Sequence, residues 1–241
     1  LLVGHSTTGT ISSAHYNTAL GIGAMDALTS GDYNIAVGYN AGTVLTTGSY
    51  NILIGGLAGD ALIGGGKNVA IGHSAFTSED GHGGNVAIGY NALTTQNAGT
   101  DAYNIAVGFK AGESVSTGVK NILIGGIAGD ALTTGNYNVA IGYQALTTED
   151  GHSGNVAVGY QTLMGQNAGA DAYNVAVGYN AGLYVTTGAN NVLIGGLAGD
   201  ALTTGFGNTA LGHGALSTED AGDRSVGVGY FALNAQNVSG G

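Results

Sequence analysis

The chain repeats a nine-residue pattern in which small residues alternate with β-branched ones. Residues 138–146 read Asn-Val-Ala-Ile-Gly-Tyr-Gln-Ala-Leu, and residues 85–93 and 34–42 read almost the same. The second and fourth residues of each copy are mostly Val or Ile, and alternation of period two indicates a β-strand. We therefore expect one short strand in each copy, for example at residues 86–88, 105–107 and 139–141.

The spacing of the copies indicates the architecture. The glycine of the pattern recurs fourteen times at steps of seventeen positions, except for two steps of nineteen, so that three shorter steps and one longer step form a super-repeat. Such a unit is too short for the helix pairs of tetratricopeptide or ankyrin arrays, but it suits one coil of a solenoid. We expect an all-β protein, a parallel β-solenoid (β-roll) of about 14 coils with 17–19 residues each, roughly 67 Å long at ~4.8 Å per coil.

The two faces of each strand differ in size. We expect the Val and Ile side chains to fill the interior of the coil. The opposite face carries Asn, Ala and Gly, which are too small and apolar for a face left in water. This composition predicts that a second copy of the chain packs against it.

Two columns of equivalent residues follow from the repeat. Coils stacked about 4.8 Å apart place equivalent amides within hydrogen-bonding reach of one another. We expect a structural ladder of asparagines beside a column of glycines at Asn34, Asn51, Asn68, Asn85, Asn104, Asn121 and Asn138, and at Gly38, Gly72, Gly89 and Gly142.

Once in each super-repeat, a larger residue at one position of the pattern is accompanied by a smaller residue at another. Where the central Ala of the pattern becomes Leu, at positions 53, 123 and 193, the residue after the glycine becomes Gly, at positions 56, 126 and 196. A close-packed interior requires that volume added in one place is removed nearby. We therefore expect these pairs to compensate each other.

The pattern Asn-Val-Ala-Ile-Gly-Tyr-x-Ala resembles the Ser-Val-Ala-Ile-Gly-x-x-Ala repeat of trimeric autotransporter adhesin heads, the YadA-like heads, and similar repeats in phage tail fibres. The resemblance covers essentially the whole chain. It implies a left-handed parallel β-roll in which three chains pack side by side, that is, a homotrimer. The chain departs from that family in its longer repeat and in the opening Asn in place of Ser.

Charge and composition narrow the possible partners. The net charge is −11 and only four residues are basic, so one chain cannot form a basic face for nucleic acid. No run approaches the roughly 18 apolar residues of a membrane span, and cysteine is absent. The chain begins within a repeat at Leu1, and we interpret residues 1–241 as a single solenoid domain cut from a longer chain.

Acidic pairs recur once in each super-repeat, and two of them are followed by Gly-His. These possible surface contact loops contain Glu79, Asp80, His82, Glu149, Asp150 and His152. General acid–base catalysis needs one asymmetric cleft with separated pKa values, which equal copies do not provide. We expect solvated turns, with a metal or glycan contact as the alternative, and we assign no catalytic residue, metal ligand or cofactor.

Other candidate groups also have structural interpretations. Asp60, Asp130 and Asp200 lack the nonapeptide of calcium-binding β-rolls and are expected to turn the backbone. His5, His73 and His213 share a column with Tyr39, Tyr90, Tyr143, Tyr160, Tyr179 and Tyr230, where stacking between coils competes with metal or sugar binding. The Thr-Thr-Gly connections suggest ice binding, but adjacent threonines point to opposite sides of an extended chain.

These features predict a function without catalysis. We expect a structural or adhesive segment of an extracellular fibre, on a phage tail or a bacterial surface, that associates with itself and contacts a host-surface glycan or protein. The alternatives are a glycan-cleaving solenoid enzyme and an ice-binding solenoid.

Overall fold

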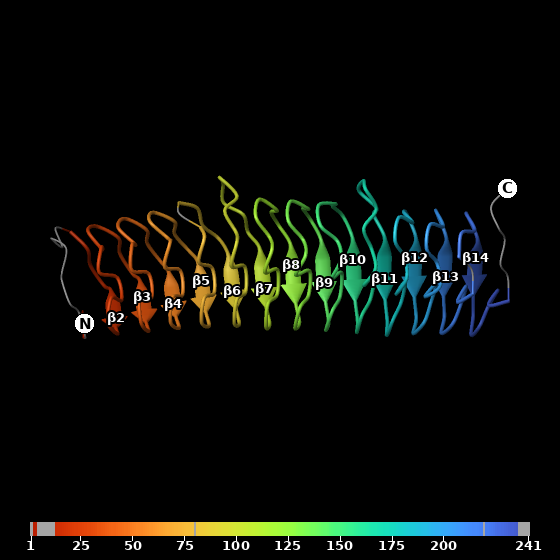
Figure 1. The fold of residues 1–241 in the computed structure, drawn as a ribbon, viewed down its shortest axis with the longest axis horizontal. Coiled ribbons are helices and arrows are strands. Elements are labelled where there is room, and N and C mark those ends of the chain that lie inside the picture. Colours follow the sequence, from red (N-terminus) through yellow and green to blue (C-terminus); the bar gives the residue numbers. More distant parts are fainter. Residues whose placement is uncertain (1, 4–12, 80, 219, 236–241) are drawn as a thin grey trace. The chain divides into compact units, whose positions relative to one another are not determined.

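The computed structural model describes residues 2–3, 13–79, 81–218 and 220–235 (Figure 1). The chain forms two compact units, residues 1–120 and 121–241. The described residues contain strands and turns but no helix, so none of them forms a helix that could cross a membrane.

The first unit consists of short parallel strands, each paired with the next one in the chain. They are β1 (Leu2–Val3), β2 (Thr18–Leu20), β3 (Ile35–Val37), β4 (Ile52–Ile54), β5 (Val69–Ile71), β6 (Val86–Ile88) and β7 (Ile105–Val107). Thr18 pairs with Ile35 and Ile35 with Ile52, which is the shorter step of the repeat. Val86 pairs with Ile105, which is the longer step.

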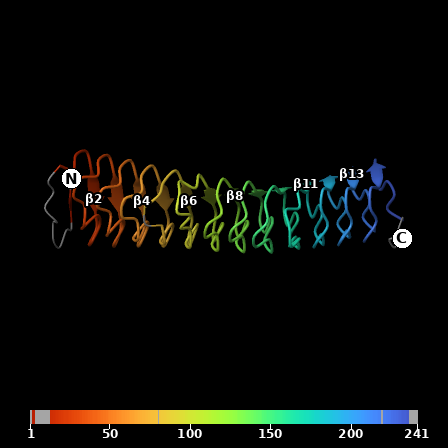
Figure 2. The same ribbon diagram turned by 90° about the horizontal axis from the view of Figure 1, so that it is seen from above.

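The second unit repeats this arrangement, and Figure 2 shows successive strands of each unit side by side. Its strands are β8 (Ile122–Ile124), β9 (Val139–Ile141), β10 (Val156–Val158), β11 (Val175–Val177), β12 (Val192–Ile194), β13 (Thr209–Leu211) and β14 (Val226–Val228). Val139 pairs with Val156, and the longer step joins Val156 to Val175.

These pairings confirm the all-β class, the parallel β-solenoid and the coil length expected from the repeat. Among the described residues each unit has seven strands and therefore six strand-to-strand turns, twelve in total, against the expected fourteen coils.

The assignment of the two strand faces from the sequence was wrong. The central residue of each of the strands β2–β14 is buried, as at Ala70, Ala140 and Ala157, whereas the flanking residues, mostly Val and Ile, are half-buried or exposed. The other interior places belong to larger side chains from the turns, such as Phe76, Leu93 and Leu146, all fully buried. Because these side chains already fill the narrow coil, only a methyl group fits opposite them, and the β-branched residues point outward.

The larger side chain at position 53 is compensated by glycine, as expected, but the compensating glycines are Gly42 and Gly59 and not Gly56. The Leu53 side chain is fully buried, whereas Gly56 lies across from the ring of His73. A Cβ added at Gly59 would lie 2.8 Å from Leu53 Cδ2, and one added at Gly42 would lie 2.6 Å from Leu53 Cδ1. These turn glycines occupy places that Phe76 and Leu93 fill in other coils, and they make the room for Leu53.

The glycine that ends each strand is required by the close contact between coils. Gly142 has a φ of +139°, and a Cβ there would lie 2.1 Å from the carbonyl oxygen of Gly159 in the next coil. An L-residue is strained at this φ and would also collide with the backbone. The same contact, at 2.4 Å, occurs between Gly72 and Gly89. A side chain in this column would force the coils apart.

Candidate functional site

The asparagine column is a ladder of hydrogen bonds from backbone to side chain. The backbone N–H of Asn51 donates to Asn34 Oδ1 at 2.9 Å, and that of Asn138 donates to Asn121 Oδ1 at 2.9 Å. Direct amide-to-amide bonds also occur, as from Asn51 Nδ2 to Asn34 Oδ1 at 3.0 Å, but they are the lesser part. The same backbone bond joins Asn68 to Asn51, Asn85 to Asn68, and Asn104 to Asn85.

The same amides hold the loops of the following coil. Asn138 Nδ2 donates to the carbonyl of His152 at 2.8 Å, and Asn68 Nδ2 donates to that of His82 at 3.1 Å. These asparagines are fully buried, so each one satisfies backbone groups that would otherwise be unpaired in the interior. The column therefore positions the two loops that contain Gly-His.

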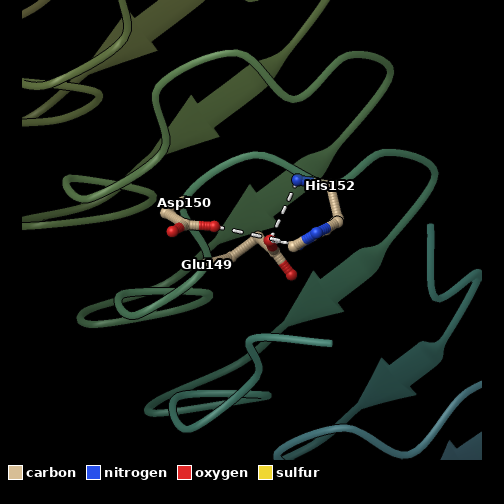
Figure 3. Close-up of side chains that lie close together, drawn as sticks. All are labelled: Glu149, Asp150 and His152. Carbon is tan, nitrogen blue, oxygen red and sulfur yellow. Dashed lines mark hydrogen bonds and ion pairs between the residues drawn. The ribbon is translucent and has the colours of Figure 1, made fainter. Parts of the chain in front are cut away.

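In the second unit, three ionisable side chains converge in the loop after Thr148. His152 Nδ1 lies 2.6 Å from Glu149 Oε1 and 3.8 Å from Asp150 Oδ1. The backbone N–H of His152 also donates to Glu149 Oε1 at 3.0 Å. Figure 3 shows one carboxylate oxygen of Glu149 between the side chains of Asp150 and His152. One candidate ligand atom from each residue lies within 4.8 Å of the other two.

The first unit contains the same pairing. His82 Nδ1 lies 3.0 Å from Glu79 Oε1, and the backbone N–H of His82 donates to that oxygen at 3.0 Å. Asp80, also predicted for this loop, lies outside the described residues.

The expectation of solvated acidic turns was wrong for the two glutamates. Glu79 and Glu149 are fully buried, whereas the side chain of Asp150 is 59% exposed. The glutamates occupy the interior column that holds Leu62 and Leu132 in the preceding coils and Gln96 and Gln166 in the following ones. The sequence contained this signal, because each glutamate lies one step of the repeat from those positions.

The Asp60 and Asp200 carboxyls lie partly inside the turns. Burial raises the pKa of Asp60, although hydrogen bonds from the backbone of Asp60 and Ala61 oppose the change. Burial likewise raises the pKa of Asp200, against backbone hydrogen bonds and the nearby His213. These backbone bonds agree with a role in the turn. Asp130 belongs to the same place in the repeat.

Aromatic side chains form two stacked columns. In the predicted one, Tyr143 stacks on Tyr160 at 5.7 Å and Tyr160 on Tyr179 at 5.4 Å between ring centroids, and His73 and His213 stack on Tyr90 and Tyr230. His5 lies outside the described residues. The second column precedes the asparagines and was missed, although Tyr directly before Asn recurs in the sequence.

The second column has closer and flatter stacking. Tyr16, Tyr33 and Tyr50 stack at 4.7 and 5.1 Å with ring planes within 10°. Each of these tyrosines has a positive φ of 58–64°. Within both columns the stacked rings cover one another's faces. Such an array disfavours the face-on contact through which an aromatic ring binds a sugar.

The outward face of the strands is apolar. The exposed fraction is 40% for Ile35, 36% for Ile105 and 37% for Val192. The exposed aromatic columns flank this face, with Tyr33 on one side of β3 and Tyr39 on the other. We call it the Val/Ile face: the first and third residues of each strand. No charged residue occupies these positions in the described strands β2–β14.

The threonines of the Thr-Thr-Gly turns bind the neighbouring coil. Thr46 Oγ1 donates to the carbonyl of Ile63 at 3.0 Å, and Thr186 Oγ1 donates to that of Thr203 at 3.0 Å. Their hydroxyl protons are thus engaged between coils, which weighs against a regular threonine array that binds ice.

Comparison of the chain with protein-family models, curated proteins and solved structures found no match in any of the three.

Proposed function

We propose that this chain is a non-catalytic, structural and adhesive segment of an extracellular fibre, on a phage tail or a bacterial surface, whose working form is a parallel homotrimer. The observation that carries the proposal is the Val/Ile face. Apolar residues recur there at every turn, and contiguous exposed apolar surface marks a site of association.

The repeat itself indicates the partner on this face. A surface with one apolar row per coil is buried along its length only by a partner whose rows have the same spacing. A second copy of the chain has that spacing by construction. The number three and the parallel orientation come from the resemblance to YadA-like heads, and the extracellular location rests on the same resemblance.

The observed site chemistry favours structure over catalysis. The asparagine, threonine and aromatic columns all bind neighbouring coils, and the acidic pairs recur once in each super-repeat of the sequence rather than marking a single catalytic position. The role of contacting a host-surface glycan or protein is assigned to exposed loops, because scaffolded loops commonly carry binding function and weak contacts add through multivalency.

Charged substitutions on the Val/Ile face test the proposal. We expect a chain with Val139→Lys, Val156→Lys and Val175→Lys to sediment as a monomer under conditions in which the unmodified chain is a trimer. These residues begin adjacent strands, so three unpaired charges would be buried in the interface.

The matched control places three lysines at exposed loop positions, Asn97→Lys, Thr100→Lys and Asn167→Lys. The control should sediment like the unmodified chain. Equal sedimentation of the two triple variants would overturn the assignment of the interface. Release of reducing ends from a surface polysaccharide, lost on Glu149→Gln, would instead support the glycan-cleaving alternative.

A further inference from the structure

Glu149 is a buried carboxyl group in which His152 binds one oxygen and the other oxygen is left unpaired. Its carboxylate is fully buried, and its Oε2 atom has no hydrogen-bond partner. Among the described residues, His152 is the only one that forms an ion pair with it, and no Lys or Arg does so. A buried carboxylate is costly unless a compensating charge accompanies it.

The second copy of the loop repeats the problem. Glu79 is also fully buried, its Oε2 atom also lacks a partner, and its ion pair is again with a histidine at i+3. A buried glutamate paired with a histidine at i+3 thus occurs in two loops, one super-repeat apart. This recurrence argues against an accident of packing. Side chains of His82 and His152 remain 31% and 18% exposed, so solutes can reach both loops.

We propose that the loop of Glu149, Asp150 and His152 binds a divalent transition-metal ion of the Zn²⁺ type, and that the loop of Glu79 and His82 forms a second such site. Two ligand atoms bound to one tetrahedral Zn²⁺ lie about 3.4 Å apart, given metal–ligand distances of ~2.0–2.2 Å. The 3.8 Å between His152 Nδ1 and Asp150 Oδ1 is close to that value, and a bound ion would replace the 2.6 Å hydrogen bond between His152 Nδ1 and Glu149 Oε1.

The ligand types select among cations. One imidazole with carboxylates suits Zn²⁺ or a similar metal, whereas Ca²⁺ and Mg²⁺ prefer oxygen ligands alone. The bound ion would neutralise the Glu149 carboxylate, whose charge is shared by both oxygens. Three protein ligands leave a fourth position for water or for a group from another molecule.

The chain contains its own negative control. The third acidic pair, Glu219-Asp220, is followed by Ala-Gly, so that Gly222 stands where the other loops have His82 and His152. The proposal therefore predicts two bound ions per chain and not three.

Calorimetric titration of the chelator-treated full chain with Zn²⁺ tests the proposal. We expect two equivalents for the unmodified chain, one for His152→Gln and none for His82→Gln with His152→Gln. His73→Gln removes an exposed imidazole that stacks on Tyr90, and it should keep two equivalents. Absence of binding at 1 mM Zn²⁺, or the same stoichiometry for His152→Gln and His73→Gln, would overturn the proposal.

A second variant covers the case in which His152→Gln does not fold. Asp150→Asn changes an exposed side chain and keeps the backbone carbonyl that Thr133 binds. It should weaken one of the two sites by at least roughly 10–100-fold, because the loss of a proposed ligand should cost no less than the loss of a group that only supports a ligand. Unchanged affinity at both sites would exclude Asp150 as a ligand and refute the proposed site.

Discussion

At the scale of single residues, buried polar groups connect one coil to the next. Asn138 accepts a hydrogen bond from the backbone N–H of Asn155 at 2.9 Å and donates one to the carbonyl of His152 at 2.8 Å. One side chain thereby satisfies backbone groups of the following coil, which the short strands cannot pair by themselves. The asparagine column belongs to the backbone hydrogen-bonding scheme as much as to the side-chain packing.

Asn138→Ala should destabilise the protein by at least about 2 kcal/mol, because each buried backbone group left unpaired costs ~1–3 kcal/mol. Urea denaturation followed by circular dichroism measures the change. Asn167→Ala makes the same chemical change at an exposed position and should have little effect. Equal losses for both variants would mean that the ladder does not stabilise the interior.

The raised pKa of Asp60 has a consequence for stability. Between that raised native value and the ordinary value of 3.8, the native state binds more protons than the unfolded state, so stability falls as pH rises through this window. Asp60→Asn should therefore be more stable than the unmodified chain at pH 7, and its advantage should shrink as the pH falls toward 4.

Denaturation midpoints measured at several pH values in that range test this expectation. An advantage of Asp60→Asn that stays constant from pH 7 to pH 4 would contradict the assigned cause.

At the scale of the coil, the sequence predicted the element but not its orientation. Period and alternation correctly located strands such as β6 and β9 to the residue. The inward face could not be read from β-branching, because the decision depends on which side chains the turns contribute to the same narrow interior. Phe76, Leu93 and Leu146 lie outside the strands, and their burial leaves room only for Ala.

The same packing rule predicts a compensating pair. Leu53→Ala should cost about 2–5 kcal/mol, because it leaves a cavity where Leu53 was fully buried. Adding Gly59→Leu should recover much of this loss. The double variant copies the Ala-and-large pattern of the next coil, where Ala70 accompanies Phe76, and Phe76 tolerates a φ of +58° at the equivalent turn position.

A double-mutant cycle of unfolding free energies measures this coupling. Gly59→Leu alone is the matched control and should destabilise, since its Cβ would lie 2.8 Å from Leu53 Cδ2. Additive effects of the two substitutions would show that Leu53 and Gly59 do not share one space.

At the scale of the whole molecule, the sequence predicted the fold class better than the candidate site. The parallel solenoid could be predicted because the fixed length of the sequence repeat indicates it whichever face of the strands points inward. The burial of Glu149 could not be recognised from local composition, since Thr-Glu-Asp-Gly reads as a solvated turn and only its alignment with Leu132 and Gln166 places it inside. The reversal of the strand faces also moves the expected interface from Asn and Ala to Val and Ile.

The mass of the unmodified protein in solution tests the central claim most directly. Light scattering at micromolar concentration should give three times the chain mass of 23.5 kDa. Such a result is predicted because the Val/Ile face repeats at every turn and is matched by another copy of itself. A mass of 23.5 kDa at the same concentration would contradict the claim that this face joins copies of the chain.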